Sequence, residues 1–129
     1  MPVRVKSQRE SFVRFVTDMR DAESLSSQGV FSAAYALLES TMLDRHEHEW
    51  LTDTIDWYKA NLPVPRYFAQ RKASRFAICW FRTSAQEKIQ RLWDLVHLLK
   101  EHGVYIRAIR TTRPGEIVFE DDYQIVAIP

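Results

Sequence analysis

Basic side chains gather around one apolar segment, residues 76–81, which reads as a buried strand. Arginine beside exposed aromatic rings suits phosphate contacts and base stacking, and Tyr67, Phe68 and Tyr105 lie near these charges in the sequence. The sequence therefore predicts a basic surface that binds a nucleic acid or another partner. Its members are Arg66, Arg71, Lys72, Arg75, Arg82 and Arg107.

A second interpretation of the same charges needs no partner. Glu116, Glu120 and Asp121 could pair with the basic residues as ordinary cross-strand charges. The formal net charge is only +1, so the chain as a whole is not drawn toward nucleic acid. Nucleic-acid binding is therefore the alternative function, and not the leading expectation.

The one cluster with metal-ligand chemistry is segment 44–49, where His46 and His48 stand between carboxylates. Zinc motifs on helices use spacings such as i, i+4, whereas side chains two positions apart point to different sides of a helix. Acids are also favourable at a helix start, near the positive end of its dipole. We interpret the segment as a solvated helix start and predict no metal, while binding by these two histidines stays open.

Residues for nucleophilic or acid–base chemistry are poorly placed. Cys79 lies within the apolar strand, where burial raises a thiol pKa and denies access, so a pairing with His97 or His102 is disfavoured. The acids at 116 and 120–122 suit hairpin turns, because such side chains bond to nearby backbone. We predict no catalytic residue and no cofactor, and a small enzyme is the third hypothesis.

Charge distribution and one tryptophan favour binding to a protein. An acidic stretch precedes the basic one, and opposite charges of this kind orient a protein partner or a second copy of the chain. Trp57 lies beside the helical stripe of Ile55, Tyr58 and Leu62, so it is a candidate exposed anchor for a partner. The leading expectation is a non-catalytic interaction or regulatory module that binds a protein partner or itself. The acidic stretch comprises Asp44, Glu47, Glu49, Asp53 and Asp56.

Length and composition limit the kinds of fold that could position the candidate binding residues. The chain has 129 residues, 46% hydrophobic and 27% charged, which suits a single domain with its own core. One cysteine cannot form an internal disulfide and suits a reducing compartment. No secretory leader follows Met1, and no apolar run is long enough to span a membrane. We therefore expect a cytoplasmic protein that does not enter a membrane.

Residues 7–63 are expected to be helical. Apolar stripes predict helices over 30–42 and 50–62, and the latter ends before Pro63, which lacks an amide hydrogen. The connection 65–74 is expected to dock on the body through Tyr67 or Phe68. An earlier helix is expected after Ser7, a candidate N-cap, on residues that recur at helical intervals: Phe12, Val13, Phe15, Val16 and Met19.

Residues 75–128 are expected to form strand, helix and three further strands. Strand 76–81 is apolar on both faces, which predicts helix 84–102 on one face and the N-terminal helices on the other. Ser84 and Glu87 form a capping-box pattern, Gly103 suits a left-handed stop, and Pro114-Gly115 suits a type II turn. Strand 104–111 should run parallel to the first. The predicted class is α+β, with N-terminal helices on a small mixed sheet of about four strands in β-α-β-β-β order.

Three segments carry a resemblance: residues 57–65 (WYKANLPVP), 79–81 (CWF) and 113–127 (RPGEIVFEDDYQIVA). They resemble a group of small uncharacterised bacterial proteins. That group shares a Trp-aromatic helix ending in Asn-Leu-Pro, and an ending of Pro-Gly, strand, aromatic-Glu-Asp and Gln-Val-Val-Ala. The resemblance implies a bacterial or phage-like cytoplasmic origin, and it carries no activity, ligand or fold with it.

Overall fold

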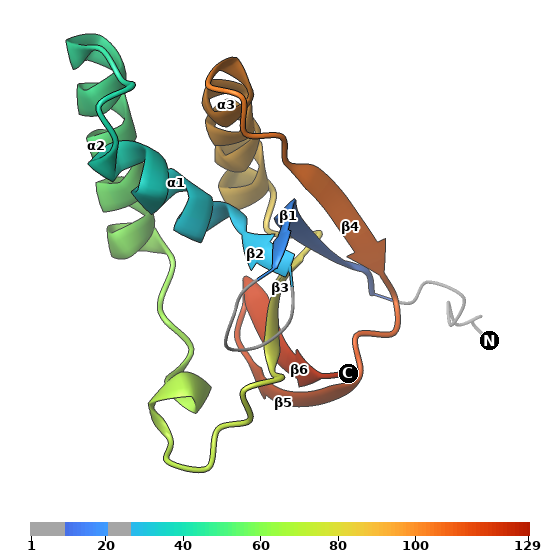
Figure 1. Ribbon diagram of the computed structural model, residues 1–129. Helices are drawn as coiled ribbons and strands as arrows, with labels where there is room; N and C mark the ends of the chain where they lie inside the picture. Colours follow the sequence, from blue (N-terminus) through green and yellow to red (C-terminus); the bar gives the residue numbers. More distant parts are fainter. Residues whose placement is uncertain (1–9, 21–26) are drawn as a thin grey trace.

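The computed structural model describes residues 10–20 and 27–129, and Figure 1 shows the arrangement of their elements. The predicted α+β class is confirmed, and so is the β-α-β-β-β order of the C-terminal half. The elements are β1 (Phe12–Arg20), β2 (Ser27–Gly29), α1 (Val30–Glu39), α2 (Arg45–Asn61), the 3₁₀ turn η1 (Arg66–Ala69), β3 (Ile78–Arg82), α3 (Gln86–Glu101), β4 (Arg107–Thr111), β5 (Glu116–Glu120) and β6 (Gln124–Ile128).

The first apolar segment is a strand, so the helix predicted there is wrong. β1 buries Phe12 and Val16 on one face and Val13 and Phe15 on the other. A strand buried on both faces loses the alternation of apolar and polar residues, and here its apolar positions coincide with a helical stripe. The aromatic and β-branched residues that favour strands are the better guide. The predicted N-cap, Ser7, lies outside the described residues.

The sheet is built around β1, and each of its strand pairs is antiparallel. On one side β1 pairs with β3 and then with β2, and on the other side it pairs with β4. β6 and β5 continue the sheet beyond β3. The sheet differs from the expected mixed one because β1 separates β3 from β4. Those two strands do run in the same direction, since both are antiparallel to β1.

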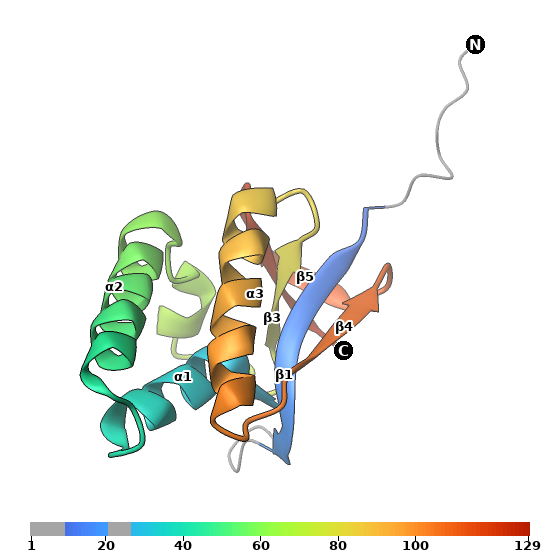
Figure 2. The same cartoon turned by 90° about the horizontal axis from the view of Figure 1, so that it is seen from above.

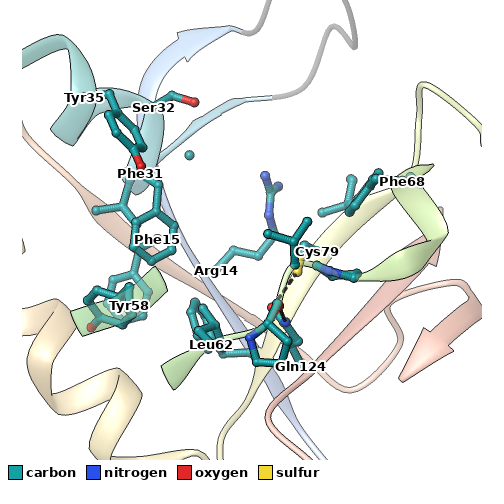
Figure 3. Close-up of a pocket in the computed structure, with 18 of the residues that line it drawn as sticks. Arg14, Phe15, Phe31, Ser32, Tyr35, Tyr58, Leu62, Phe68, Cys79 and Gln124 are labelled. Carbon is teal, nitrogen blue, oxygen red and sulfur yellow. Dashed lines mark hydrogen bonds between the residues drawn. The ribbon is translucent and has the colours of Figure 1, made fainter. Parts of the chain in front are cut away.

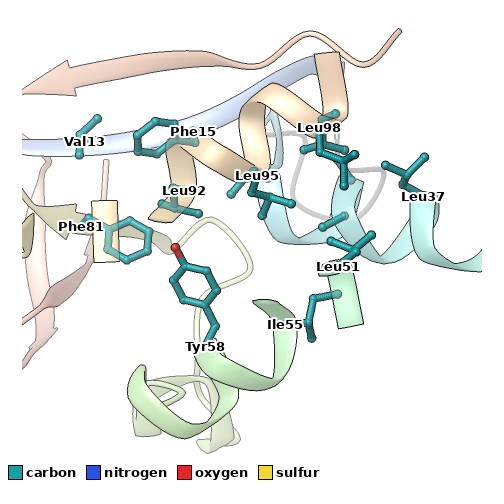
Figure 4. Close-up of a cluster of buried hydrophobic side chains, with 14 residues drawn as sticks. Val13, Phe15, Leu37, Leu51, Ile55, Tyr58, Phe81, Leu92, Leu95 and Leu98 are labelled. Carbon is teal, nitrogen blue, oxygen red and sulfur yellow. The ribbon is translucent and has the colours of Figure 1, made fainter. Parts of the chain in front are cut away.

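All three helices pack on one face of the sheet (Figure 2). The expected position of α3 on the opposite face is wrong, because Leu37 of α1, Leu51 of α2 and Leu92 of α3 share one core with strand residues (Figure 4). The other face is buried by residues from the strands themselves. That second cluster comprises Phe12, Trp80, Ile125 and Ala127, packed with Ile78 and Ile109.

Helix α2 starts and ends where local chemistry requires. The carboxylate of Asp44 accepts from the backbone N–H of Glu47 (2.8 Å), and the Glu47 carboxylate accepts from the N–H of Asp44 (3.0 Å), which completes a capping box. The helix ends at Asn61, before Pro63, as predicted. The chain then leaves the helical layer and crosses toward η1.

The start of α3 departs from prediction, whereas the two turn glycines follow it. Ala85 occupies the N-cap position of α3 and makes no side-chain cap, so the predicted cap by Ser84 is wrong. Gly103 and Gly115 have positive φ angles of 81° and 112°, which confirms the helix stop and the left-handed turn position.

Candidate functional site

Arg82, one of the predicted binding residues, joins three parts of the sheet. Its guanidinium contacts the carboxylates of Glu10, just before β1, and of Glu120 in β5 (2.7 Å), while Nε donates to the carbonyl of Asp121 (2.7 Å). The Arg82 side chain is only 15% exposed. Its pKa is raised, chiefly by the hydrogen bond with Glu10. These contacts occupy all three guanidinium nitrogens within the fold.

The other predicted basic residues lie in two separate places. Arg66, Arg71, Lys72 and Arg75 are exposed on η1 and the loop that follows it. Arg107 lies on β4 instead, exposed and 3.6 Å from the carboxylate of Asp18. Figure 1 places η1 and β4 on opposite sides of the molecule. We call Arg66, Arg71, Lys72 and Arg75 the basic segment; Arg82 and Arg107 are not part of it.

The basic segment carries aromatic rings among its charges. Within the described residues none of its four members forms an ion pair, so the predicted pairing with Glu116, Glu120 and Asp121 is not formed there. The Arg75 guanidinium lies 4.9 Å from the centre of the Phe76 ring. Phe76 and Phe68 are 45% and 44% exposed. The segment therefore presents free cations beside accessible rings.

Trp57, expected as an exposed anchor, is half-buried against α3. The guanidinium of Arg91 lies 4.0 Å from the centre of its ring, and the Tyr58 ring meets it edge-on at 5.1 Å. Trp57 also packs against the core that the three helices share with the strands. Its exposed surface is correspondingly small, and its observed contacts join α2 to α3.

Cys79 has the environment of a structural thiol. Its Sγ donates to Oε1 of Gln124 (3.2 Å), and burial raises its pKa to about 12. His102, one of the two histidines that could serve as its base, contacts the carboxylate of Glu47 at 3.0 Å. Asp121 accepts from two backbone N–H groups in its own turn, as the turn interpretation predicts. These contacts engage Cys79, His102 and Asp121 within the fold.

The two histidines of the candidate metal cluster are exposed on the first turn of α2. His46 and His48 point into solvent-accessible space, and neighbouring Glu47 is engaged by the capping box and His102. In residues 10–20 and 27–129 no group of three or more histidine, cysteine or acidic side chains could hold a metal ion.

A cavity of about 790 Å³ opens between the helical layer, η1 and β3 (Figure 3). Pockets that hold small molecules have volumes of roughly 300–1,000 Å³ and mainly apolar walls. The walls here come from β1, α1, the end of α2, the segment after it, and β3. Their apolar and aromatic members include Phe15, Phe31, Ile55, Tyr58, Leu62, Phe68, Ile78 and Phe81.

The pairing pattern of the sheet creates this space. β3 pairs with β1 as far as Val13, and β2 pairs with it from Val16 onward. Arg14 and Phe15 lie in the interval between the two partners, and both line the cavity. The cation of Arg14 and the ring of Phe15 therefore border the cavity where β1 has neither β3 nor β2 as a partner on that side.

Hydrogen bonds fix the wall on the η1 side. The Gln124 side chain, which accepts from Cys79, donates to the carbonyl of Pro63 (2.5 Å). Tyr67 is buried, and its hydroxyl accepts from the backbone N–H of Ser74 (2.8 Å). The expected docking of the connection 65–74 is thus confirmed through Tyr67, and the wall is tied to β3 and β6.

The cavity is electropositive. Three cationic side chains line it, Arg14, Lys59 and Arg75, whereas no acidic side chain does so among its described lining residues. Lys59 and Arg75 are exposed, but Arg14 is half-buried, and desolvation lowers its pKa. Figure 3 shows Arg14 between the rings of Phe15 and Phe31 on one side and Cys79 on the other.

Sequence reasoning missed Arg14. It is the single charge within the apolar run FVRFV, residues 12–16. Assigned to a helix, it would lie on a polar face and call for no explanation. In a strand buried on both faces the same charge is unusual, because isolated charges are costly to bury. A lone charge in an apolar strand is the signal that identifies this residue.

Comparison with protein-family models, with curated proteins and with solved structures finds no match. The resemblance to small bacterial proteins therefore stays a prediction. In the part of the chain that the structure describes, no helix is both long and apolar enough to cross a membrane.

Proposed function

We propose that the protein is a non-catalytic binding module whose recognition site is the cavity between α1, the end of α2, η1 and β3. The observation that carries this proposal is a space of about 790 Å³ with aromatic and aliphatic walls and a few polar groups. Wall segments from distant parts of the chain are held by hydrogen bonds, so the site is formed in advance of binding. A cytoplasmic location, and a regulatory use of the bound state, belong to the same proposal.

The proposal can be tested with a neutral apolar dye, N-phenyl-1-naphthylamine, whose fluorescence rises when it leaves water. We expect saturable binding with one dye per chain. Ala77 lines the cavity, so Ala77→Trp should fill part of the space and abolish this binding. Ala60 is exposed on α2 and does not line the cavity, so Ala60→Trp is the matched control and should bind normally.

Two results would contradict the proposal. One is dye binding by Ala77→Trp that equals that of the unchanged protein, because the dye would then occupy another surface. The other is an absence of saturable binding to the unchanged protein. Circular dichroism and thermal unfolding of both variants establish that each is folded before its binding is compared.

Exposed apolar side chains at the rim of the cavity could bind a protein partner or a second copy of the chain, and so regulate it. Val64 and Phe68 line the cavity and are 81% and 44% exposed, so an occupant that contacts them changes the surface offered to a partner. Light scattering with and without a bound occupant measures whether the chain self-associates in a ligand-dependent way.

Nucleic-acid binding is the second candidate, favoured by the exposed rings of the basic segment and by its cations, which form no ion pair with any residue that the structure describes. Phosphate contacts and base stacking are the two interactions that single-stranded nucleic acid requires. The test is binding of labelled single- and double-stranded nucleic acids across a salt series, beside the double variant Arg71→Glu/Arg75→Glu. Affinity that falls steeply with salt and disappears in the variant supports this function; no binding at low salt rejects it.

A further inference from the structure

We propose that the ligand of the cavity is a monocarboxylic acid with an apolar body, and that Arg14 pairs with its carboxylate. This inference rests on the function proposed above and adds the chemistry of the ligand to it. It starts from a charge that the fold places in an apolar setting, with no acid within ion-pair distance among residues 10–20 and 27–129.

Arg14 makes no ion pair, unlike four other arginines in the described residues. Within residues 10–20 and 27–129, Arg45, Arg82, Arg91 and Arg107 each lie within ion-pair distance of a carboxylate, whereas Arg14 does not. Its guanidinium carbon instead lies 5.6 Å from the centre of the Trp80 ring. An aromatic face attracts a cation but does not neutralise it, so no side chain in the described part of the chain balances the charge of Arg14.

Cys79 cannot supply that balance. It lines the same cavity, and its thiolate would be an adjacent anion. Burial, however, raises its pKa to about 12, so the sulfur is a neutral thiol at physiological pH, and its hydrogen is directed to Gln124. A bound anion is therefore the group that would neutralise Arg14.

The remaining lining groups set the shape and charge of the occupant. The walls next to Arg14 are aromatic and aliphatic, so the body of the ligand must be apolar. A guanidinium binds a carboxylate through two parallel hydrogen bonds, an arrangement that lysine cannot reproduce. One half-buried guanidinium balances one negative charge. A monoanion is therefore the better match than a dianionic phosphate, because Lys59 and Arg75 are exposed and already solvated.

The experiment compares ligands that share an apolar body and differ in the head group: decanoate, 1-decanol, decylammonium and decyl phosphate. Isothermal titration calorimetry with the full chain measures each affinity. Decanoate should bind about 10- to 100-fold more tightly than decanol, the range expected for a hydrogen-bonded charge pair. As pH falls through the pKa of the ligand itself, decanoate affinity should approach that of decanol. This comparison requires no variant of the protein.

Variants then assign the preference to Arg14. Arg14→Met should abolish the advantage of decanoate over decanol while decanol still binds, and Arg14→Lys should restore the advantage only in part. Arg113 is exposed in the turn after β4 and does not line the cavity, so Arg113→Met is the matched control and should keep the full preference.

The outcomes separate this inference from the function on which it rests. Equal binding of decanoate and decanol, or tighter binding of decylammonium or decyl phosphate, overturns the carboxylate assignment but leaves an apolar binding module standing. A decanoate preference that survives Arg14→Met overturns the role of Arg14. Failure of all four ligands and of the neutral dye to bind overturns both proposals.

Discussion

The thiol of Cys79 donates to Oε1 of Gln124 across 3.2 Å, and the amide of Gln124 in turn donates to the carbonyl of Pro63. These two bonds connect β3, β6 and the segment that closes the cavity. Gln124 is 3% exposed, so its polar atoms depend on these partners. The cavity wall is thus coupled to the protonation of a buried thiol.

That coupling predicts a loss of stability at alkaline pH. The thiol of the unfolded chain ionises near its ordinary pKa of 9.0, while the folded thiol keeps its proton until about 12. Between these values the folded state binds more protons, so the free energy of unfolding should fall as pH rises, with a slope that steepens from near zero at pH 8 toward about 1.4 kcal/mol per unit above pH 10. Urea unfolding between pH 8 and 10 measures this slope.

Cys79→Ala removes the thiol and should flatten the slope over this range. Tyr58, whose pKa is also raised by burial, contributes a similar loss only at higher pH, above the ordinary tyrosine value of 10.0. The comparison uses slopes, because the substitution itself changes the absolute stability. An unchanged slope in Cys79→Ala would show that the thiol is not the group responsible.

Arg82 should prove a structural residue when it is replaced. Arg82→Met leaves the carbonyl of Asp121 and the carboxylates of Glu10 and Glu120 without their donor, so we expect the free energy of unfolding to fall by about 2 kcal/mol. Glu120 is 62% exposed, so Glu120→Gln should cost less than about 1 kcal/mol. Urea unfolding of both variants, beside Arg113→Met, provides the measurement. If Arg82→Met lowers the free energy of unfolding no more than Arg113→Met does, Arg82 is not a structural residue and becomes a candidate for binding a partner again.

Position 115 requires glycine, because its backbone has a positive φ and because there is no room for a Cβ atom. Its φ is 112°, and a Cβ there would lie 2.2 Å from the carbonyl oxygen of Ile128. Gly115→Ala should therefore destabilise the β5–β6 pairing by at least about 1–3 kcal/mol. Gly29 is the control, because its φ is −79° and a Cβ there meets nothing within 4 Å. Gly29 is the N-cap of α1, so Gly29→Ala carries only the modest cost of alanine at a cap and should destabilise less than Gly115→Ala in thermal unfolding; equal losses for the two variants would contradict this account.

Most features with local causes could be predicted from the sequence, the cap at Ser84 excepted, whereas the order of the strands, which distant partners set, could not. The positive φ of Gly103 and Gly115 and the end of α2 before Pro63 follow from neighbouring residues. The place of β1 between β3 and β4 depends on pairing between segments far apart in the chain, which periodicity does not report. Arg14 was hidden by the same error, because a charge is ordinary on a helix and unusual in a buried strand.

Arg14 should be a residue that lowers stability in order to bind. The fold leaves its guanidinium half-buried and without a carboxylate partner in the described residues, and methionine fills a similar volume without that desolvated charge. Replacement also removes the contact with Trp80, worth about 0.5–1 kcal/mol, so the net gain for Arg14→Met should be about 1 kcal/mol. Urea unfolding without ligand provides the measurement, and decanoate should then stabilise the unchanged protein more than the variant. A variant that is less stable than the unchanged protein, and equally stabilised by decanoate, would mean that Arg14 serves packing against Trp80 and not recognition.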